Sequence, residues 1–317
     1  MTSASASTVE TVLRDELVRA DRALSGVAPV LGHMLASSGH SLVSDAIVAR
    51  VRGMLSDLAR QLLERAPTND DSKVGFRIDP VDALADALAD DTQVLAHVHA
   101  AAMEGHLTQR LESRSAIDPV LTPLWQELIA SDNPGIGESA MQALAAQSRF
   151  CQTQRRMQYP LSELPPDTLE RVLKIWVRMT AVEQEPSVMT ALRALKGEYD
   201  EAATRAGQLN QVISRMQGAA IAALELEHSG LALFVSALSH LTGQSRDRAV
   251  LACHSRQAAR LALSLRAAGQ DEAGIERQFM VLEPAAMVPP SITDLSIGAA
   301  RTILQGSQSD TPSEAMA

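Results

Sequence analysis

The sequence predicts an all-α fold, and composition and periodicity are the two observations that predict it. Hydrophobic residues make up 46% of the 317 residues, but aromatic residues only 3%. Most of the apolar content is Ala and Leu, which lose little freedom in a helix. Sheet proteins use more Val, Ile, Thr and aromatic residues than this. Apolar residues also recur at helical spacing. We therefore expect antiparallel helical hairpins, arranged as an irregular HEAT-like repeat or a multi-helix bundle.

The first two helices are expected at residues 9–37 and 41–65, on either side of a Ser-Ser-Gly-His-Ser break. The second helix carries one apolar stripe at helical spacing, formed by Leu42, Ile47, Val51, Leu55, Leu58 and Leu62. Two amphipathic helices cannot bury both stripes against each other alone. Residues 1–66 are therefore predicted to form an N-terminal helical hairpin that docks on the rest of the chain or forms a homodimer through residues 9–65.

A main helical domain is expected at residues 80–284, after a linker at 67–79. The linker contains Pro, Gly, Asn and Asp with little periodicity. Asp79 and Pro80 then form a predicted N-cap and first helical position. An apolar helix end followed by an acidic turn occurs at 88–98 and again at 129–141. The two turns lie about 40 residues apart, which is the spacing of HEAT-type hairpins.

The last part of the chain is expected to hold helices at residues 230–243 and 245–269, capped by Gly243, Ser245 and Gly269. The second helix has five arginines that we expect to face solvent: Arg246, Arg248, Arg256, Arg260 and Arg266. Residues 285–317 are predicted to be a mostly disordered tail. Within it, the apolar patch at 291–304 is expected either to fold onto the body or to bind elsewhere.

Charge and cysteine content favour a cytoplasmic protein. The formal net charge of −10 argues against a general nucleic-acid binder, which needs a basic face. Two cysteines provide no disulfide framework and fit a reducing compartment. The N-terminus carries charges before any apolar run, unlike a secretory signal. No apolar stretch is long enough to be a membrane span.

No enzyme class is indicated by the motifs, and no cofactor is expected. A glycine-rich phosphate loop and a Gly-x-Ser-x-Gly elbow are both absent from the sequence. His97, His99 and His106 fall on one predicted helix, but metal ligands on a helix must lie one turn apart. His99 and His106 are two turns apart, about 10.5 Å along the axis. We therefore expect no metal site.

The stretch SRFCQTQRRMQYPLSELPPD, residues 148–167, is the main candidate for a binding site. One interpretation is structural, since cations at the end of a helix stabilise its dipole by about 0.3–1 kcal/mol. The other is that exposed arginines beside a stiff connector bind an acidic partner segment or a phosphate. The candidate partner-binding residues are Arg149, Gln154, Arg155, Arg156 and Tyr159.

Two alternatives belong to other functional classes. A signalling or phosphotransfer component would use the N-terminal hairpin, with His33 or His40 as the phosphoacceptor. A small-ligand-binding protein would use a cavity lined by Trp125, Trp176 and Met179.

The runs IDPVLTPLWQELIASDNPGIG and LALFVSALSHLTGQSRDRAVLACHS resemble uncharacterised α-proteobacterial proteins that carry a helical, HEAT-like domain of unknown function. The resemblance covers approximately residues 80–283. It implies a helical-repeat interaction protein and supplies no catalytic residues. The function expected from the sequence is therefore a non-enzymatic adaptor or regulatory protein that binds another protein through a helical groove.

Overall fold

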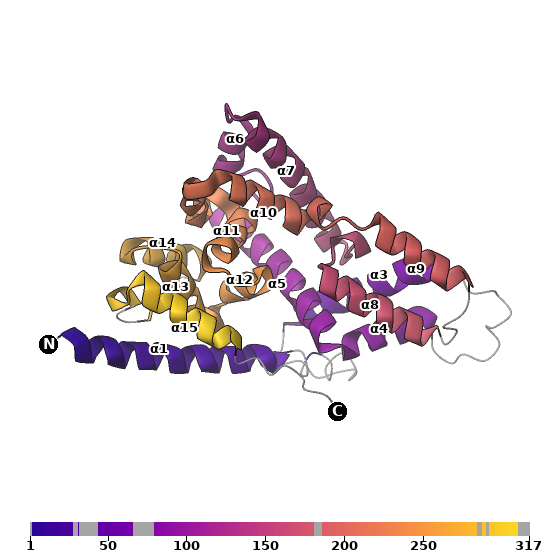
Figure 1. The fold of residues 1–317 in the computed structure, drawn as a ribbon, viewed down its shortest axis with the longest axis horizontal. Helices are drawn as coiled ribbons and strands as arrows, with labels where there is room; N and C mark the ends of the chain where they lie inside the picture. Colours follow the sequence, from indigo (N-terminus) through magenta and orange to yellow (C-terminus); the bar gives the residue numbers. More distant parts are fainter. Residues whose placement is uncertain are drawn as a thin grey trace. The chain divides into compact units, whose positions relative to one another are not determined.

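The structure is a computed structural model that describes residues 2–27, 31, 44–65, 79–180, 186–283, 287–289 and 292–309. Within these ranges every regular element is an α-helix or a 3-10 helix (Figure 1), which confirms the all-α prediction. None of the helices in these ranges has the length and apolar character needed to cross a membrane. The chain divides into two compact units built from separated segments. Unit 1 contains Met1–Ser25, Met103–Gln147 and Gln208–Ala317, and unit 2 contains Gly26–Ala102 and Ser148–Gly207.

Unit 1 is built around α11 (Leu226–Thr242) and α13 (Ala258–Ala267). The neighbours of α11 are α6 (Pro123–Ile129), η4 (Gln217–Leu224), α12 (Arg246–Ala252), α13 and α14 (Glu272–Leu282). Every residue of α11 from Ser229 to Leu238 is buried. A helix that is apolar on all sides belongs in the centre of a core, and α11 occupies that place.

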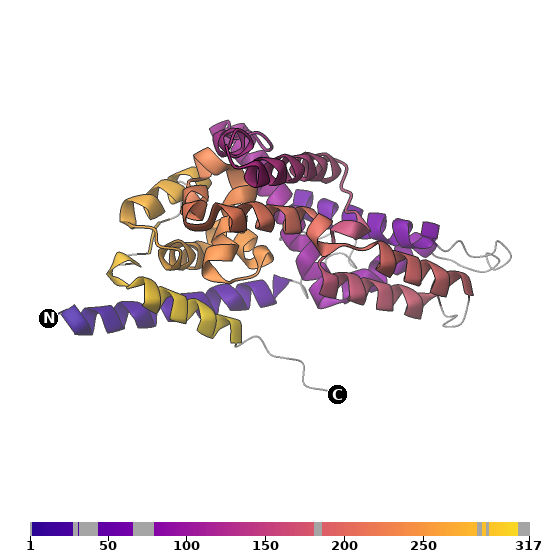
Figure 2. The same ribbon diagram turned by 45° about the horizontal axis from the view of Figure 1, so that its top comes forward.

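Helices α1 (Thr2–Ser25) and α15 (Ile297–Ser309) both pack against α13 and lie side by side (Figures 1 and 2). α1 buries Leu13, Leu17 and Ala20, and α15 buries Ala300, Ile303 and Leu304. The prediction of a mostly disordered tail at 285–317 is therefore wrong for 297–309, whose apolar residues recur at helical spacing and fold onto the body. Residues 310–317 lie outside the described part.

Unit 2 contains α3 (Asp45–Arg65), α4 (Pro80–Asp90), α8 (Pro166–Met179) and α9 (Pro186–Glu198). It also takes the start of α5 (Thr92–Ser115) and the end of α7 (Pro134–Arg155). α4 packs against both α3 and α8. The stripe predicted for α3 is confirmed from Ile47 to Leu62, all of whose members are buried. Leu42 lies outside the described residues.

The predicted division into an N-terminal hairpin and a main domain is not the one that the structure has. α1 belongs to unit 1 and α3 to unit 2, so residues 1–66 are not one unit. The reason is that α1 buries its apolar face on α13 and α15, whereas α3 buries its own on α4. The range 80–284 is likewise shared between both units. The homodimer through 9–65 stays a prediction.

Helix starts and ends follow the predicted caps. Of the predicted linker 67–79, only Asp79 is described, and its carboxylate accepts a hydrogen bond from the Val81 amide at 2.9 Å. Ser245 caps α12 by accepting from the Arg248 amide at 3.3 Å. Gly243 and Gly269 have φ values of 72° and 102°, which glycine adopts at little cost.

The single helix predicted at 245–269 is in fact broken. α12 ends at Ala252, His254 is extended with φ −86° and ψ 144°, and η5 (Ser255–Gln257) precedes α13. The His254 Nδ1 atom accepts a hydrogen bond from the Arg256 amide at 3.2 Å, which stabilises the break. The interruption changes the helical phase, so Arg260, expected in solvent, is fully buried.

Candidate functional site

The end of α7 is closed by a Schellman motif. The Met157 amide donates to the Gln154 carbonyl at 3.2 Å, and the Gln158 amide donates to the Thr153 carbonyl at 2.9 Å. This pattern places Met157 in the left-handed region, with φ 55°. Glycine is usual at this position, because a side chain there costs about 1 kcal/mol or more. α7 is thus followed by a defined turn in which a methionine, Met157, occupies the position where glycine is usual.

Helix α3 runs directly past this point. A Cβ atom placed on Gly53 would lie 2.6 Å from the Met157 Cβ atom, so the two backbones approach closely because residue 53 has no side chain. In the last turn of α7, the Nε2 atom of the buried Gln154 lies 3.3 Å from the Met54 sulfur. α3 therefore contacts both the last turn of α7 and Met157, the residue that closes it.

The connector after α7 is fastened to α3 by two side chains. Asp57 accepts from the Tyr159 amide at 3.1 Å. Gln61 donates to the Tyr159 carbonyl at 2.9 Å and accepts from the Leu161 amide at 3.0 Å. Gln61 also donates to Asp57 at 2.7 Å, which orients both groups. The Tyr159 amide and carbonyl and the Leu161 amide of this proline-rich segment are thereby satisfied by side chains.

The side chain of Tyr159 lies inside unit 2, with 7% of its surface exposed. Its hydroxyl donates to the Glu163 carbonyl at 3.2 Å and lies 2.9 Å from the His97 Nε2 atom. The two rings meet edge to face with centroids 5.6 Å apart. Tyr159 and the buried Gln154 thus hold the connector in place, and neither presents its side chain to a partner.

The three candidate arginines remain on the surface. Arg149, Arg155 and Arg156 are exposed, and the adjoining Met157 is 40% exposed. These four residues are called the α7-end surface below. The helix dipole explains a cation in the last turn, which is the place of Arg155. It does not explain Arg149, since the effect falls off within one turn.

No sequence pattern indicated that α3 contributes to this site. Asp57 is 4% exposed, and a carboxylate is rarely so buried unless it is paired. In the sequence, Asp57 stands among the polar positions of an amphipathic helix, where a residue normally faces solvent. Only the fold brings it to the connector, about one hundred residues later in the chain.

The residues of the alternative sites lie in different parts of the chain. His33 and His40 lie outside the described residues. Trp125 is buried in unit 1, and Trp176 is buried in unit 2. Met179, on the same helix as Trp176, is 45% exposed. Within the described ranges, no three His, Cys, Asp or Glu side chains are grouped so as to hold a metal ion.

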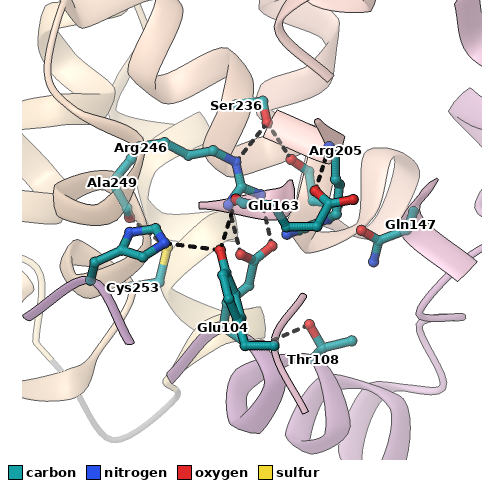
Figure 3. A network of polar contacts seen from close by, with 12 residues as sticks. Glu104, Thr108, Gln147, Glu163, Arg205, Ser236, Arg246, Ala249 and Cys253 are labelled. Atoms are coloured by element: carbon teal, nitrogen blue, oxygen red, sulfur yellow. Dashed lines mark hydrogen bonds and ion pairs between the residues drawn. The ribbon is translucent and has the colours of Figure 1, made fainter. Parts of the chain in front are cut away.

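A second polar cluster lies in unit 1, where the Arg246 guanidinium points to Glu104 and Ser236 (Figure 3). Arg246 makes two hydrogen bonds to Glu104, at 2.6 and 2.7 Å, and a third to the Ser236 hydroxyl at 3.2 Å. Glu104 is 2% exposed. This fork-to-fork pair compensates the buried Glu104 carboxylate with the half-buried Arg246 guanidinium, and it joins α5, α11 and α12.

The cysteine beside this pair is unsuited to act as a nucleophile. Burial, and after it the Glu104 carboxylate, raise the pKa of the Cys253 thiol to about 12. Burial, followed by Arg110 and Arg256, lowers the pKa of His254. A thiol that remains protonated at neutral pH is a poor nucleophile. The unit 1 cluster is therefore a structural ion pair with an inert thiol beside it.

Comparison with protein-family models finds no match for the chain, and searches of curated proteins and of solved structures find none either.

Proposed function

We propose that the chain is a non-enzymatic helical adaptor or regulatory protein, acting in the cytoplasm, that binds another protein at the α7-end surface. The observation that supports this proposal is the exposure of Arg149, Arg155 and Arg156 on a helix end whose backbone is already fixed by α3. A preformed site avoids the entropic cost of ordering a loop on binding.

The expected partner is acidic. Arginine forms forked, charge-assisted hydrogen bonds with carboxylates, and it is enriched at protein interfaces. The net charge of −10 disfavours extended contact with nucleic acid, because the rest of the surface would repel it. The helix-turn-helix succession of this chain suits a HEAT-like groove, which is the architecture we propose for the interaction.

Affinity capture from the source cytosol tests the proposal. The variant Arg149→Glu/Arg155→Glu/Arg156→Glu reverses the charge of the α7-end surface. A matched control, Arg19→Glu/Arg22→Glu/Arg114→Glu, reverses three exposed arginines in unit 1. We expect wild type and control to retain one identified acidic protein that the first variant loses, with circular dichroism unchanged in all three. Retention of the same proteins by all three chains contradicts the proposal.

A further inference from the structure

A histidine side chain caps the break between α12 and α13. The His254 Nδ1 atom accepts a hydrogen bond from the Arg256 amide at 3.2 Å, and the His254 carbonyl accepts one from the Gln257 amide at 2.8 Å. An Nδ1 atom can accept only while it carries no proton. The usual capping residues, such as Ser and Asn, offer their acceptor at every ordinary pH, whereas a histidine loses it in mild acid.

The ionisable groups around the His254 ring are Arg110 and His106 from α5, Cys253 and Arg256 on either side of it in the chain, and Glu283 directly after α14. Arg110, Arg256 and His106 disfavour a positive charge on the ring, whereas Glu283 favours one. The Glu283 carboxylate is already paired with Arg110 at 2.9 Å. Burial, followed by Arg110, therefore lowers the pKa of His254 below its ordinary value of 6.5, and the cap is formed at neutral pH.

The capped break is joined directly to the docking site of α1. Gln257, the last residue of η5, donates to the Ala20 carbonyl of α1 at 3.0 Å. One turn later, the fully buried Arg260 forms an ion pair with Asp21 of α1. Both side chains reach α1 because η5 sets the helical phase in which α13 begins. The polar contacts between α13 and α1 therefore depend on the conformation that His254 caps.

We infer that His254 is a pH-sensitive latch for α1. While its ring is neutral, it caps η5 and keeps Gln257 and Arg260 directed at α1. Protonation removes the Nδ1 acceptor and places a new cation beside Arg110 and Arg256, which loosens the break and releases α1 from α13. The latch does not depend on the proposed function. It makes exposure of the face of α13 that α1 covers a response to mild acid.

The direction of the pH dependence follows from which state binds a proton more readily. With α1 released and the break open, the His254 ring takes up a proton near its ordinary pKa of 6.5, whereas the docked state resists protonation because burial and Arg110 lower this pKa. Docking is therefore at full strength above pH 6.5 and weakens as the pH falls below 6.5 toward the pKa of the docked state.

Hydrogen exchange of the full-length chain at about pH 7.5 and about pH 5.5, on either side of an ordinary histidine pKa, tests the latch. Exchange rates are divided by those of unstructured peptides, so that the intrinsic effect of pH on exchange cancels. We expect the protection of the α1 amides around Leu13 and Leu17 to fall about fivefold in acid, the effect of losing one side-chain cap. The α4 amides of unit 2 should keep their protection.

His254→Asn is the decisive variant, because an Asn side chain can accept the same amide at both pH values. We expect its α1 protection to be equal at the two pH values. His240→Asn replaces an exposed histidine of α11 in the same unit and should keep the pH dependence of wild type. Arg256→Gln removes an exposed cation beside the ring, so it should raise the pKa of His254 and move the midpoint of the loss to higher pH.

Three results overturn the inference. They are equal α1 protection at both pH values in wild type, a loss in acid that survives in His254→Asn, and an equal loss in α4, which would indicate that acid destabilises the whole chain. If His254→Asn does not fold, the midpoint in Arg256→Gln decides. A midpoint at higher pH than that of wild type supports the role of His254, and an unchanged midpoint contradicts it.

Discussion

At the scale of single residues, Gly53 decides how closely α3 and the end of α7 meet. An added Cβ would lie 2.6 Å from the Met157 Cβ and 3.1 Å from its carbonyl oxygen. Gly53→Ala should therefore lower the free energy of unfolding by about 1–3 kcal/mol, the usual cost of overpacking. Urea denaturation measures it.

Gly197→Ala is the matched control, because nothing lies within 4 Å of an added Cβ at that position of α9. It should leave stability unchanged or raise it by up to about 1 kcal/mol, since alanine favours a helix over glycine. Equal effects of the two substitutions would contradict the close approach.

Cys253 makes the stability of unit 1 sensitive to alkaline pH. Burial raises the pKa of its thiol from 9.0 to about 12, so the folded chain holds a proton that the unfolded chain releases. The contribution of the Cys253 thiol to the free energy of unfolding is complete below pH 9 and is lost as the pH rises toward 12. Relative to Cys253→Ala, wild type should lose about 2 kcal/mol between pH 8 and pH 10.5.

Urea denaturation of both chains at the two pH values measures this change. The alanine variant should be less stable than wild type at pH 8, by about 1 kcal/mol, because it leaves a small cavity. The same difference at both pH values would show that the thiol ionises as easily in the folded chain as in the unfolded one.

At the scale of elements, one charge pair reinforces the apolar contacts that dock α1. Arg260 of α13 is fully buried and forms an ion pair with Asp21 of α1, while Gln257 donates to the Ala20 carbonyl at 3.0 Å. Burial lowers the pKa of Arg260 to about 10, so it is charged at neutral pH. Asp21→Asn should cost about 3 kcal/mol, because an uncompensated cation would remain in the interior.

Hydrogen exchange of the α1 amides measures this docking directly. We expect faster exchange around Leu13 and Leu17 in Asp21→Asn, and no change in Asp15→Asn, which removes an exposed carboxylate from the same helix. Equal exchange in the two variants would mean that apolar contacts alone hold α1.

Elements were predictable where local chemistry determines them. Asp79, Ser245 and Gly243 cap their helices as expected, because a cap depends only on its own residue and the next few. The break at His254 was not predictable, since the residues around it keep a helical pattern. The orientation of Arg260 follows from that break and from Asp21, far away in the sequence.

At the scale of the whole molecule, the sequence could not predict the two units, because neither is a continuous stretch. Composition placed a boundary at 67–79, whereas α5 and α7 each contribute to both units. The three exposed arginines of the candidate site were predictable from their place near a helix end. The burial of Gln154 and Tyr159, and the contacts from α3, depend on long-range packing that a pattern along one helix does not contain.

The central claim is that the α7-end surface binds an acidic partner. The most direct measurement is the dissociation constant of the captured, purified partner. It is measured for wild type, for Arg149→Glu/Arg155→Glu/Arg156→Glu, and for the control variant Arg19→Glu/Arg22→Glu/Arg114→Glu. The account predicts at least about a hundredfold weaker binding for the first variant, since like charges oppose the partner, and no change for the control. Equal dissociation constants for all three chains would contradict it and leave these arginines as the solvated end of a helix.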